Sequence, residues 1–298
     1  MKIVSLIPSA TEIISALNLY DNLVGVSHEC DYPKKALKLP KLTTSRIKTK
    51  QVSLKIDYDI REILEQSLSV YEVKSNLLKK LDPDVIITQS QCSVCAVSLK
   101  DVEKCLGDFI DKKPVLIDLK PNTFEDVLKD IKLVGKKLDK EEESNFLVKN
   151  IKKEINKIKA KTLNSKIKNV LCIEWIEPIM TAGNWIPQLV KFAGGKSVLA
   201  KSGKNSNFIK LEDVNFQEVD IVIFMPCGFD INRSKKEIFK SNIDYFNVLK
   251  DKKKFLVDGN KYFNRPGPDI LESTRILAEI IHPDIFPANQ NIRRWVSL

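Results

Sequence analysis

Short apolar runs alternate along the chain with longer stretches in which apolar residues recur every three or four positions. The short runs have the length and the β-branched content of buried strands. The expected strands are residues 3–7, 23–26, 84–88, 115–118, 169–175, 220–225 and 255–257. Because helical patterns separate these strands, the sequence predicts an α/β fold with mainly parallel sheets.

The stretches between the strands have the periodicity of amphipathic helices. The expected helices are residues 9–18, 59–68, 74–81, 97–106, 124–138, 185–193, 235–249 and 268–281. Ser9 and Glu12 have the spacing of a capping box, so we expect the first helix to begin at Ser9. Residues 34–58 are rich in lysine and weakly patterned, and we expect little regular structure there.

One helical segment is much longer than the rest. Residues 123–162 contain no proline and a single glycine, Gly135. The part from 141 to 162 would span about 33 Å as a helix, enough to cross a small domain. We therefore expect two Rossmann-like lobes, residues 1–122 and 167–298, joined by a rigid helical connection, residues 123–166. In that arrangement a ligand cleft would lie between the lobes.

The formal net charge is +10, from 49 basic and 39 acidic residues. Lysines are scattered along the expected helices and are not clustered with aromatic residues, so we expect no nucleic-acid partner. No stretch has the roughly 20 apolar residues of a membrane span. Residues 1–9 have the pattern of a strand rather than an export signal, because Ser5 and Pro8 interrupt the apolar run. We expect a cytoplasmic protein; a periplasmic or other extracytoplasmic one is the alternative if a signal has been removed.

Most of the reactive side chains follow three of the expected strands. The residues in these three loops are His28, Glu29 and Cys30, then Gln89, Cys92 and Cys95, then Cys227 and Phe229. In open α/β sheets, ligands bind beyond the carboxyl ends of the strands. Four of the six cysteines and one of the two histidines therefore lie where a binding site is expected.

The cysteines allow three interpretations. Cys92 and Cys95 have the two-residue spacing shared by zinc sites and redox pairs. Together with Cys30, Cys227 and His28 they could bind a soft metal such as zinc or iron. The alternatives are a redox pair and cysteines that merely pack beneath the loops. His28 could equally be a general acid or base, a pH-tuned ligand or a histidine bonded to a nearby carbonyl group.

Aromatic residues in the loops beyond the strands could form a flat apolar wall for a large ligand. They are Tyr32, Trp175, Trp185, Phe229 and Tyr262. Arg265, in a stiff turn, could bind an anionic or amide-rich group. Ser9 lies at a helix N-terminus, which favours hydrogen-bond acceptors or anions. The sequence contains no G-x-G-x-x-G, phosphate-loop, G-x-S-x-G or H-E-x-x-H motif, which weighs against several common enzyme classes.

Several segments together resemble the vitamin B12-binding proteins of ABC transporters. The segments are residues 3–12, 23–27, 31–33, 81–87 and 194–195. The resemblance implies two Rossmann-like lobes joined by a long helix, with the ligand held in the cleft. By position, it also implies that Tyr32, Trp175, Tyr262 and Arg265 lie against a corrin. Cobalamin or another corrinoid is then the expected ligand.

Three features differ from the exported members of that family. Thr88, Gln89 and Ser90 stand where a pocket tryptophan is expected, and the segment 46–76 is longer. The His-Glu-Cys segment at 28–30 and the segment at 92–98 resemble a branch labelled cobalamin-binding that has no export signals.

The leading hypothesis is a binding protein that holds a corrinoid or another metal-containing small molecule. Aromatic residues would cover the apolar faces of the ligand, with His28 or a loop thiolate near the metal. An ABC permease would be its partner if the chain is exported. The alternative is a cytosolic metal- or thiol-dependent enzyme using the same cysteines and His28, with Glu29 or Glu174 moving protons.

Overall fold

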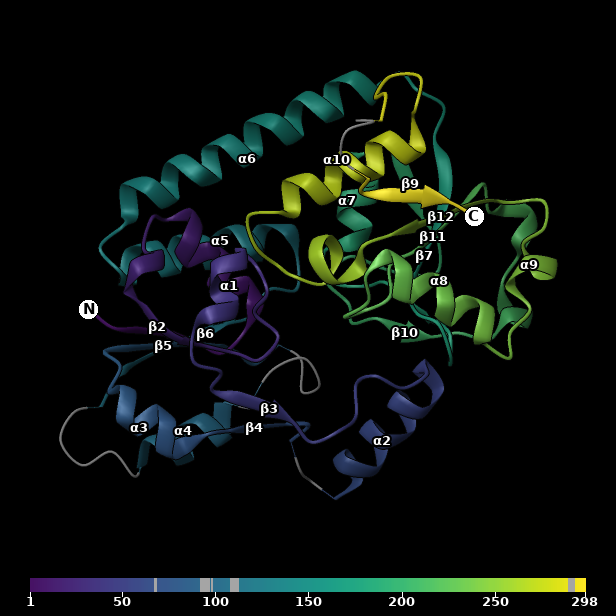
Figure 1. The fold of residues 1–298 in the computed structure, drawn as a ribbon. Coiled ribbons are helices and arrows are strands. Elements are labelled where there is room, and N and C mark those ends of the chain that lie inside the picture. Colours follow the sequence, from purple (N-terminus) through teal and green to yellow (C-terminus); the bar gives the residue numbers. More distant parts are fainter. Residues whose placement is uncertain (67–68, 92–96, 98, 108–112, 289–292) are drawn as a thin grey trace. The chain divides into compact units, whose positions relative to one another are not determined.

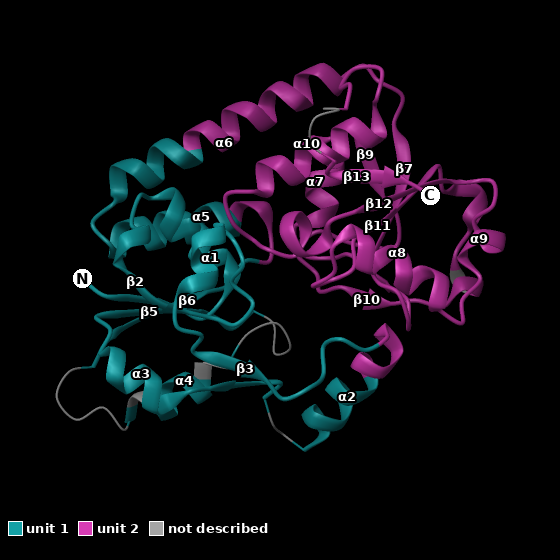
Figure 2. Cartoon of the chain, viewed as in Figure 1, with its two compact units in different colours: residues 1–51, 58–121, 126–148 teal, residues 52–57, 122–125, 149–298 magenta. Residues whose placement is uncertain are grey.

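The computed structural model describes residues 1–66, 69–91, 97, 99–107, 113–288 and 293–298. The chain divides into two compact units, shown in different colours in Figure 2. Unit 1 comprises residues 1–51, 58–121 and 126–148, and unit 2 comprises residues 52–57, 122–125 and 149–298. Each unit contains its own sheet with helices. The α/β class with mainly parallel strands, predicted from the alternating pattern, is confirmed.

Unit 1 is built on a four-stranded parallel sheet with the order β2-β1-β5-β6. Its strands are β1 (Ile3–Ser5), β2 (Leu23–Val26), β5 (Val85–Gln89) and β6 (Val115–Leu119). The helices that follow in this part of the chain are α1 (Pro8–Ala16), α2 (Ser53–Glu65), α3 (Ser75–Leu81), α4 (Leu99–Gly107) and α5 (Phe124–Lys137). A separate antiparallel pair joins β3 (Thr43–Ser45) to β4 (Tyr71–Val73). The central strands are buried on both faces, which is why they read as continuous apolar runs.

Unit 2 has a mixed sheet with the order β10-β8-β7-β11-β12-β13, and β9 also pairs with β7. Its strands are β7 (Lys168–Trp175), β8 (Met180–Thr181), β9 (Gly195–Ser197), β10 (Asn207–Phe208), β11 (Ile221–Phe224), β12 (Lys253–Val257) and β13 (Trp295–Ser297). Strands β7, β11 and β12 are parallel neighbours at the centre. The helices, labelled in Figure 1, are α7 (Ile186–Phe192), α8 (Ile231–Lys240), α9 (Tyr245–Val248) and α10 (Ile270–Ile281).

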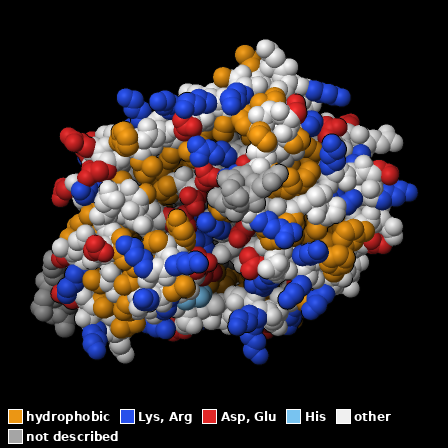
Figure 3. Space-filling model, turned by 45° about the horizontal axis from the view of Figure 1, so that its top comes forward, with side chains coloured by type: hydrophobic (Ala, Val, Ile, Leu, Met, Phe, Trp, Pro, Cys, Tyr) orange, Lys and Arg blue, Asp and Glu red, His pale blue; other side chains and the backbone are white. Residues whose placement is uncertain are grey.

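The long helix expected between the two halves is present as α6 (Glu141–Thr162). Its first turn carries three glutamates and its last turn two lysines, which complement the helix dipole. The boundary between the units falls within this helix, after Val148 (Figure 2). Among the helices of the described residues, none combines the length and the apolar character needed to cross a membrane. On the face drawn in Figure 3, basic side chains are spread among acidic and apolar ones.

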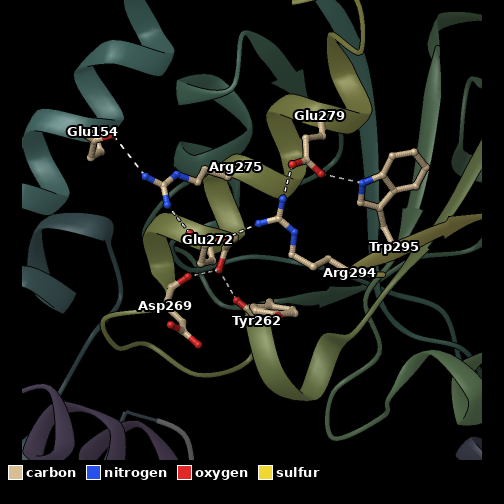
Figure 4. A network of polar contacts seen from close by, with 9 residues as sticks. Glu154, Tyr262, Asp269, Glu272, Arg275, Glu279, Arg294 and Trp295 are labelled. Atoms are coloured by element: carbon tan, nitrogen blue, oxygen red, sulfur yellow. Dashed lines mark hydrogen bonds and ion pairs between the residues drawn. The ribbon is translucent and has the colours of Figure 1, made fainter. Parts of the chain in front are cut away.

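A network of charged residues fastens the last strand of unit 2 (Figure 4). Arg294, beside β13, donates to Glu272 and Glu279 of α10. Trp295 Nε1 donates to Glu279 Oε2 at 3.0 Å. Arg275 bonds to Glu272 and also to Glu154 of α6. The distance from Arg275 Nη2 to Glu154 Oε2 is 3.3 Å. The C-terminal strand is therefore held by side-chain bonds as well as by its ladder with β12.

Three local expectations are wrong: the start of the first helix, the lack of regular structure over 34–58, and the single helix over 235–249. Helix α1 begins at Pro8, its N-cap is Ile7, and the Ser9 hydroxyl makes no hydrogen bond. Proline at the first helical position has a preset φ and no N–H group, so it sets the start of the helix one residue earlier. Residues 34–58 contain regular structure: a 3₁₀ turn, β3 and the start of α2.

The single helix expected over 235–249 is instead two helices. Helix α8 begins earlier, at Ile231, where the Asp230 side chain accepts from the Arg233 N–H. It ends at Lys240, because the backbone of Ser241 is extended, and Asp244 then caps α9. The short side chains of Ser241 and Asp244 bond to the local backbone, which favours a break over continued helix.

Candidate functional site

Strand direction places the candidate residues at one edge of each sheet. In unit 1, all four strands are parallel, so the loops after β2 and β5 emerge at the same edge. In unit 2, the same holds for the loops after β7, β11 and β12. The structure therefore puts the reactive loops of each unit where ligands of α/β proteins bind.

In unit 1, His28 is fixed by a small hydrogen-bonded group. Its Nδ1 lies 2.7 Å from Thr43 Oγ1, and its backbone N–H donates to the same oxygen at 3.0 Å. Ser27 Oγ lies 3.0 Å from Thr43 Oγ1. The Tyr71 ring lies 5.3 Å from the imidazole ring, and its hydroxyl donates to Glu29 Oε1 at 2.8 Å. The antiparallel pair β3–β4 thus supplies the two residues that hold His28 and Glu29.

The imidazole of His28 is held in its neutral form. Burial lowers its pKa below the ordinary value, and the nearby Lys41 and Lys74 lower it further. Its Nε2 is buried and makes no hydrogen bond. A neutral histidine with one ring nitrogen bonded to a hydroxyl is suited to use the other nitrogen as a ligand or base.

Cys30 is turned toward the protein interior. It is fully buried, and the Thr11 hydroxyl donates to its sulfur at 3.1 Å. Among the residues that the structure describes, no group of three or more His, Cys, Asp and Glu side chains could hold a metal ion. Cys92 and Cys95 lie outside the described residues, so the metal centre proposed around them stays a prediction.

The other candidates of unit 1 differ in exposure. Ser9 is fully buried in the first turn of α1. Gln89 is also buried at the end of β5, and its amide donates weakly to Gln91 at 3.4 Å. Tyr32 is 42% exposed and is the most accessible of them. Tyr32 is therefore the residue of this group that a ligand can reach without rearrangement.

In unit 2, the aromatic residues at the strand ends meet. The rings of Trp175 and Phe229 lie 5.4 Å apart, at an angle of 57°. The guanidinium of Arg233, from the first turn of α8, stacks over the Phe229 ring at 3.6 Å. We call this arrangement the Trp175–Phe229 platform. Arg233 was missed by the sequence analysis because nothing in the chain's local pattern links it to Phe229.

A hydrogen-bonded carboxyl group precedes Trp175 in β7. Glu174, next to Trp175 in β7, accepts from Ser206 Oγ at 2.6 Å, and the same oxygen of Ser206 accepts from the Gly183 N–H at 3.0 Å. Burial raises the pKa of the Glu174 carboxyl, and these hydrogen bonds partly offset the rise. Ser206 is a second residue that the sequence pattern did not indicate.

The loop after β12 packs against the loop after β11. The N–H of Asn260 donates to the Phe229 carbonyl at 3.1 Å, and Arg265 donates to Asn260 Oδ1 at 3.1 Å. Arg265 is only 4% exposed. Gly259 allows the close approach, because a Cβ there would lie 2.3 Å from the carbonyl oxygen of Pro226. Arg265 thus supports the loop that carries Phe229.

The remaining candidates of unit 2 are placed differently. Tyr262 is half-buried, with Lys261 Nζ 4.8 Å from its ring centre. Trp185 is 7% exposed and belongs to the core at the start of α7. Cys227 is half-buried, and its N–H donates to the Glu174 carbonyl at 3.0 Å. Of the expected aromatic wall, the structure brings Trp175 and Phe229 into contact and places both Phe229 and Trp185 in the interior.

Solved structures with the same fold extend over nearly the whole chain. A heme-binding protein from Pseudomonas aeruginosa has a TM-score of 0.75 at 14% identity, covering 99% of this chain and 97% of that one. The vitamin B12-binding protein of Vibrio cholerae has a TM-score of 0.67 at 16% identity, covering 96% and 98%. At these identities the similarity shows the two-lobed fold alone.

Sequence relatives indicate the family and the cellular location. An uncharacterized ABC transporter substrate-binding lipoprotein of Bacillus subtilis is 26% identical over 96% of this chain and 81% of its own length. A vitamin B12-binding protein of Vibrio parahaemolyticus is 24% identical over 74% and 69%. The expected cytoplasmic location is wrong, because these relatives are lipoprotein or periplasmic proteins and point to an extracytoplasmic one.

The family resemblance drawn from the sequence is confirmed. The family model described as periplasmic binding protein matches residues 3–243. That match covers most of the sequence, including the strand ends of both units, and the chain belongs to the periplasmic binding protein family.

Proposed function

We propose that this chain is the substrate-binding component of an ABC transporter and that its ligand is a corrinoid, a heme or an iron chelate. Relatives with this architecture are named for vitamin B12 and heme, and one is named as an ABC transporter substrate-binding lipoprotein. An ABC permease is then the expected partner. Binding would take place outside the cytoplasm.

The observation that carries the proposal is the Trp175–Phe229 platform. Trp175 is half-buried at the carboxyl edge of the sheet, and its ring rests on Phe229, which is 2% exposed, so the indole offers a firmly supported apolar surface. Such a surface fits a large planar ligand better than a small polar one, because stacking and burial both grow with the area of the ring system. Arg233, stacked on Phe229, would add a positive charge at the border of that surface.

His28 supports a ligand that contains a metal. Its neutral imidazole has Nδ1 bonded to Thr43, while Nε2 makes no hydrogen bond. Histidines that bind metals usually have the second ring nitrogen oriented in this way by a hydrogen bond. Because Nε2 is buried, coordination through it requires the groups that cover this atom to move, while the hydrogen bond to Thr43 keeps the ring in place. We propose that His28 and Tyr32 of unit 1 contribute to ligand binding.

The test is titration of the purified chain with cyanocobalamin, hemin and a ferric chelate, followed by absorbance and calorimetry. We expect one of these compounds to give a saturable spectral change at micromolar concentration. Trp175→Ala should weaken that binding at least about tenfold, because it removes a large aromatic contact, and Phe229→Ala should weaken it less, because the buried Phe229 acts only by supporting Trp175. Trp295→Phe is the matched control, because Trp295 bonds to Glu279 and is not part of the platform. No saturable change with any of the three compounds would reject the proposal.

A second variant tests metal coordination by His28 independently of the apolar contact with Trp175. His28→Gln keeps a polar side chain but removes the imidazole. If His28 binds the metal, the variant should lose the shift in the ligand's metal-centred absorption bands while the Trp175 fluorescence is still quenched. Unchanged bands in the variant would exclude His28 as a metal ligand and leave the platform in place.

A further inference from the structure

Two phenylalanine rings of unit 2 are stacked on each other at the surface. Phe239 lies in the last turn of α8 and is 63% exposed, and Phe246 in α9 is 37% exposed. Their centroids are 5.0 Å apart and their planes differ by 24°. Val248, 40% exposed, follows in α9. Figure 1 shows α8 and α9 as neighbouring green helices.

The outward direction of Phe246 is set by its neighbour in the chain. Tyr245 is fully buried, packs edge-to-face on Phe224 at 5.2 Å and donates its hydroxyl hydrogen to the Ile176 carbonyl. Asp244 caps the same short helix by accepting from the Asn247 N–H at 3.1 Å. Because Tyr245 anchors α9 to the core, Phe246 is presented on a rigid support rather than on a loose loop.

Exposed lysines lie close to the stacked pair in the sequence. Lys235 and Lys236 precede Phe239 by four and three residues, so they share its face of α8. Lys240 and Lys250 are also exposed and flank the two rings in the sequence. The acidic residue of this stretch of α8, Glu237, is buried and accepts from the Ser53 N–H. The surface formed by Phe239, Phe246, Val248 and these four lysines, here the Phe–Lys patch, therefore combines exposed apolar side chains with a net positive charge, because only Asp244 and Asp251 are exposed acidic residues between 235 and 251.

We propose that the Phe–Lys patch docks the chain on an anionic lipid bilayer, with the two rings entering the headgroup region and the lysines contacting lipid phosphates. Aromatic side chains favour that region, and each nearby lysine adds electrostatic attraction to anionic lipid. Specific protein interfaces are depleted in lysine and enriched in arginine, so a ring of lysines favours a fluid lipid surface over a protein partner. This surface is separate from the ligand platform and does not depend on the proposed ligand.

The chain contains a matched control in α6. Phe146 is 67% exposed, close to the value for Phe239, and it also lies on a helix. At the positions four and three residues earlier it has Glu142 and Glu143, where Phe239 has Lys235 and Lys236. If exposed phenylalanine alone caused binding, both rings would act alike. The charge around the ring distinguishes them.

The experiment is co-sedimentation of the purified chain with vesicles of phosphatidylglycerol and phosphatidylcholine, and with vesicles of phosphatidylcholine alone. We expect the chain to bind the anionic vesicles. Binding to the neutral vesicles should be at least about tenfold weaker, and so should binding to the anionic vesicles in high salt. Phe239→Ala with Phe246→Ala should reduce it about fivefold or more, and Lys235→Gln with Lys236→Gln about tenfold. Phe146→Ala should leave it unchanged.

Several outcomes would overturn the proposal. They are no binding of the unaltered chain to anionic vesicles, equal binding by the Phe239 and Phe146 variants, and salt-insensitive binding. Self-association lost in the Phe239–Phe246 variant, without vesicle binding, would instead identify an interface between copies of the chain. Binding of a single-stranded oligonucleotide in place of vesicles would also reject the lipid assignment. The lysine variant alters only exposed side chains, so its result stands even if the double phenylalanine variant folds poorly.

Discussion

The rings of Trp175 and Phe229 are in contact, with 5.4 Å between their centroids, although 53 residues separate them in the chain. The contact follows from the register of two parallel strands. Ile173 of β7 pairs with Phe224 of β11, so the residues just beyond both strands emerge together. The platform therefore depends on the loops that continue these strands and on whatever fixes those loops.

Gly259 is one such determinant. A Cβ at this position would lie 2.3 Å from the Pro226 carbonyl oxygen and 2.7 Å from backbone atoms of Met225. Since backbone atoms cannot give way cheaply, we expect Gly259→Ala to push apart the loops after β11 and β12. The hydrogen bond from Asn260 to Phe229 would be lost with them. The predicted cost is about 2–4 kcal/mol of unfolding free energy, measured by urea denaturation.

Gly107→Ala serves as the control for that substitution. A Cβ at Gly107, at the end of α4, meets no atom within 4 Å, so the change should leave stability within about 1 kcal/mol. Ligand affinity should fall in the Gly259 variant and not in the Gly107 variant. Equal stability of the two variants would show that the close approach at Gly259 is not what holds the loop.

Ser206 is predicted to stabilise the Glu174 carboxylate. Ser206→Ala removes a 2.6 Å hydrogen bond to a carboxyl group whose pKa is already raised by burial. At pH 7 the substitution should lower the unfolding free energy by about 1–3 kcal/mol, because a buried charge loses a hydrogen-bond donor. Near pH 4 the loss should shrink, because the raised pKa lets the folded state keep this carboxyl protonated. Urea denaturation at both pH values measures the difference.

Ser202→Ala, at an exposed position of the same loop region, is the control for the Ser206 variant. It should cost less than about 0.5 kcal/mol at either pH. A loss in Ser206→Ala that is the same at pH 7 and pH 4 would mean that the hydroxyl serves the loop backbone, through Gly183, rather than the charge on Glu174.

The elements that the sequence predicts well are those with long or repeated patterns. Helices α5 and α6 show their periodicity over 14 and 22 residues, and the buried strands are continuous apolar runs. Strands β8 and β10 have two residues each, too few to show any period. Strand β8 pairs with β7 and β10 pairs with β8, so both form by pairing with strands from elsewhere in the chain, which is a tertiary effect.

The candidate site shows the same division. That reactive residues follow strands could be read from the chain, because strand ends are local features. That Thr43 bonds to His28, or Arg233 stacks on Phe229, could not, because these contacts join separate segments. Trp185 shows the opposite error: its place at the start of the helix expected over 185–193 is correct, but its ring is buried there and not available to a ligand. The local sequence pattern indicates the sheet edge at which the candidate residues lie, but tertiary packing determines which side chains are in contact there.

Asp130 gives a prediction for the pH dependence of stability. This residue of α5 is 8% exposed, and burial raises its pKa to about 7, although the Lys120 N–H donates to it at 3.2 Å. Between its ordinary value near 4 and about 7, the folded state holds a proton that the unfolded state has lost. Stability of the unaltered chain should therefore fall as the pH rises through this range.

Asp130→Asn removes that titration while keeping a neutral side chain of similar shape. The variant should match the unaltered chain near pH 4 and exceed it above pH 7 by roughly 2–4 kcal/mol, the scale of a shift of this size. Thermal or urea unfolding across the pH range measures both curves. Parallel curves for the two proteins would show that Asp130 titrates near its ordinary value in the folded state.

Arg294 is expected to be the most sensitive residue of the network in Figure 4. Its side chain is 10% exposed and bridges Glu272 and Glu279. Arg294→Ala would leave two poorly solvated carboxylates without this partner and release the strand that begins at Trp295, so we expect a loss of about 3–5 kcal/mol. Arg294→Lys should lose less, since an ammonium group keeps the charge but lacks the fork that reaches two carboxylates.

Arg275 provides the comparison for Arg294 within the same network. It bonds to Glu272 and to Glu154, but its side chain is 40% exposed, so water screens both pairs. Arg275→Ala should therefore cost no more than about 1 kcal/mol. Urea denaturation of the three variants gives the order Arg294→Ala, Arg294→Lys, Arg275→Ala from largest loss to smallest. Equal losses at the two arginines would mean that burial does not govern this network and that β13 is held by its backbone ladder with β12 alone.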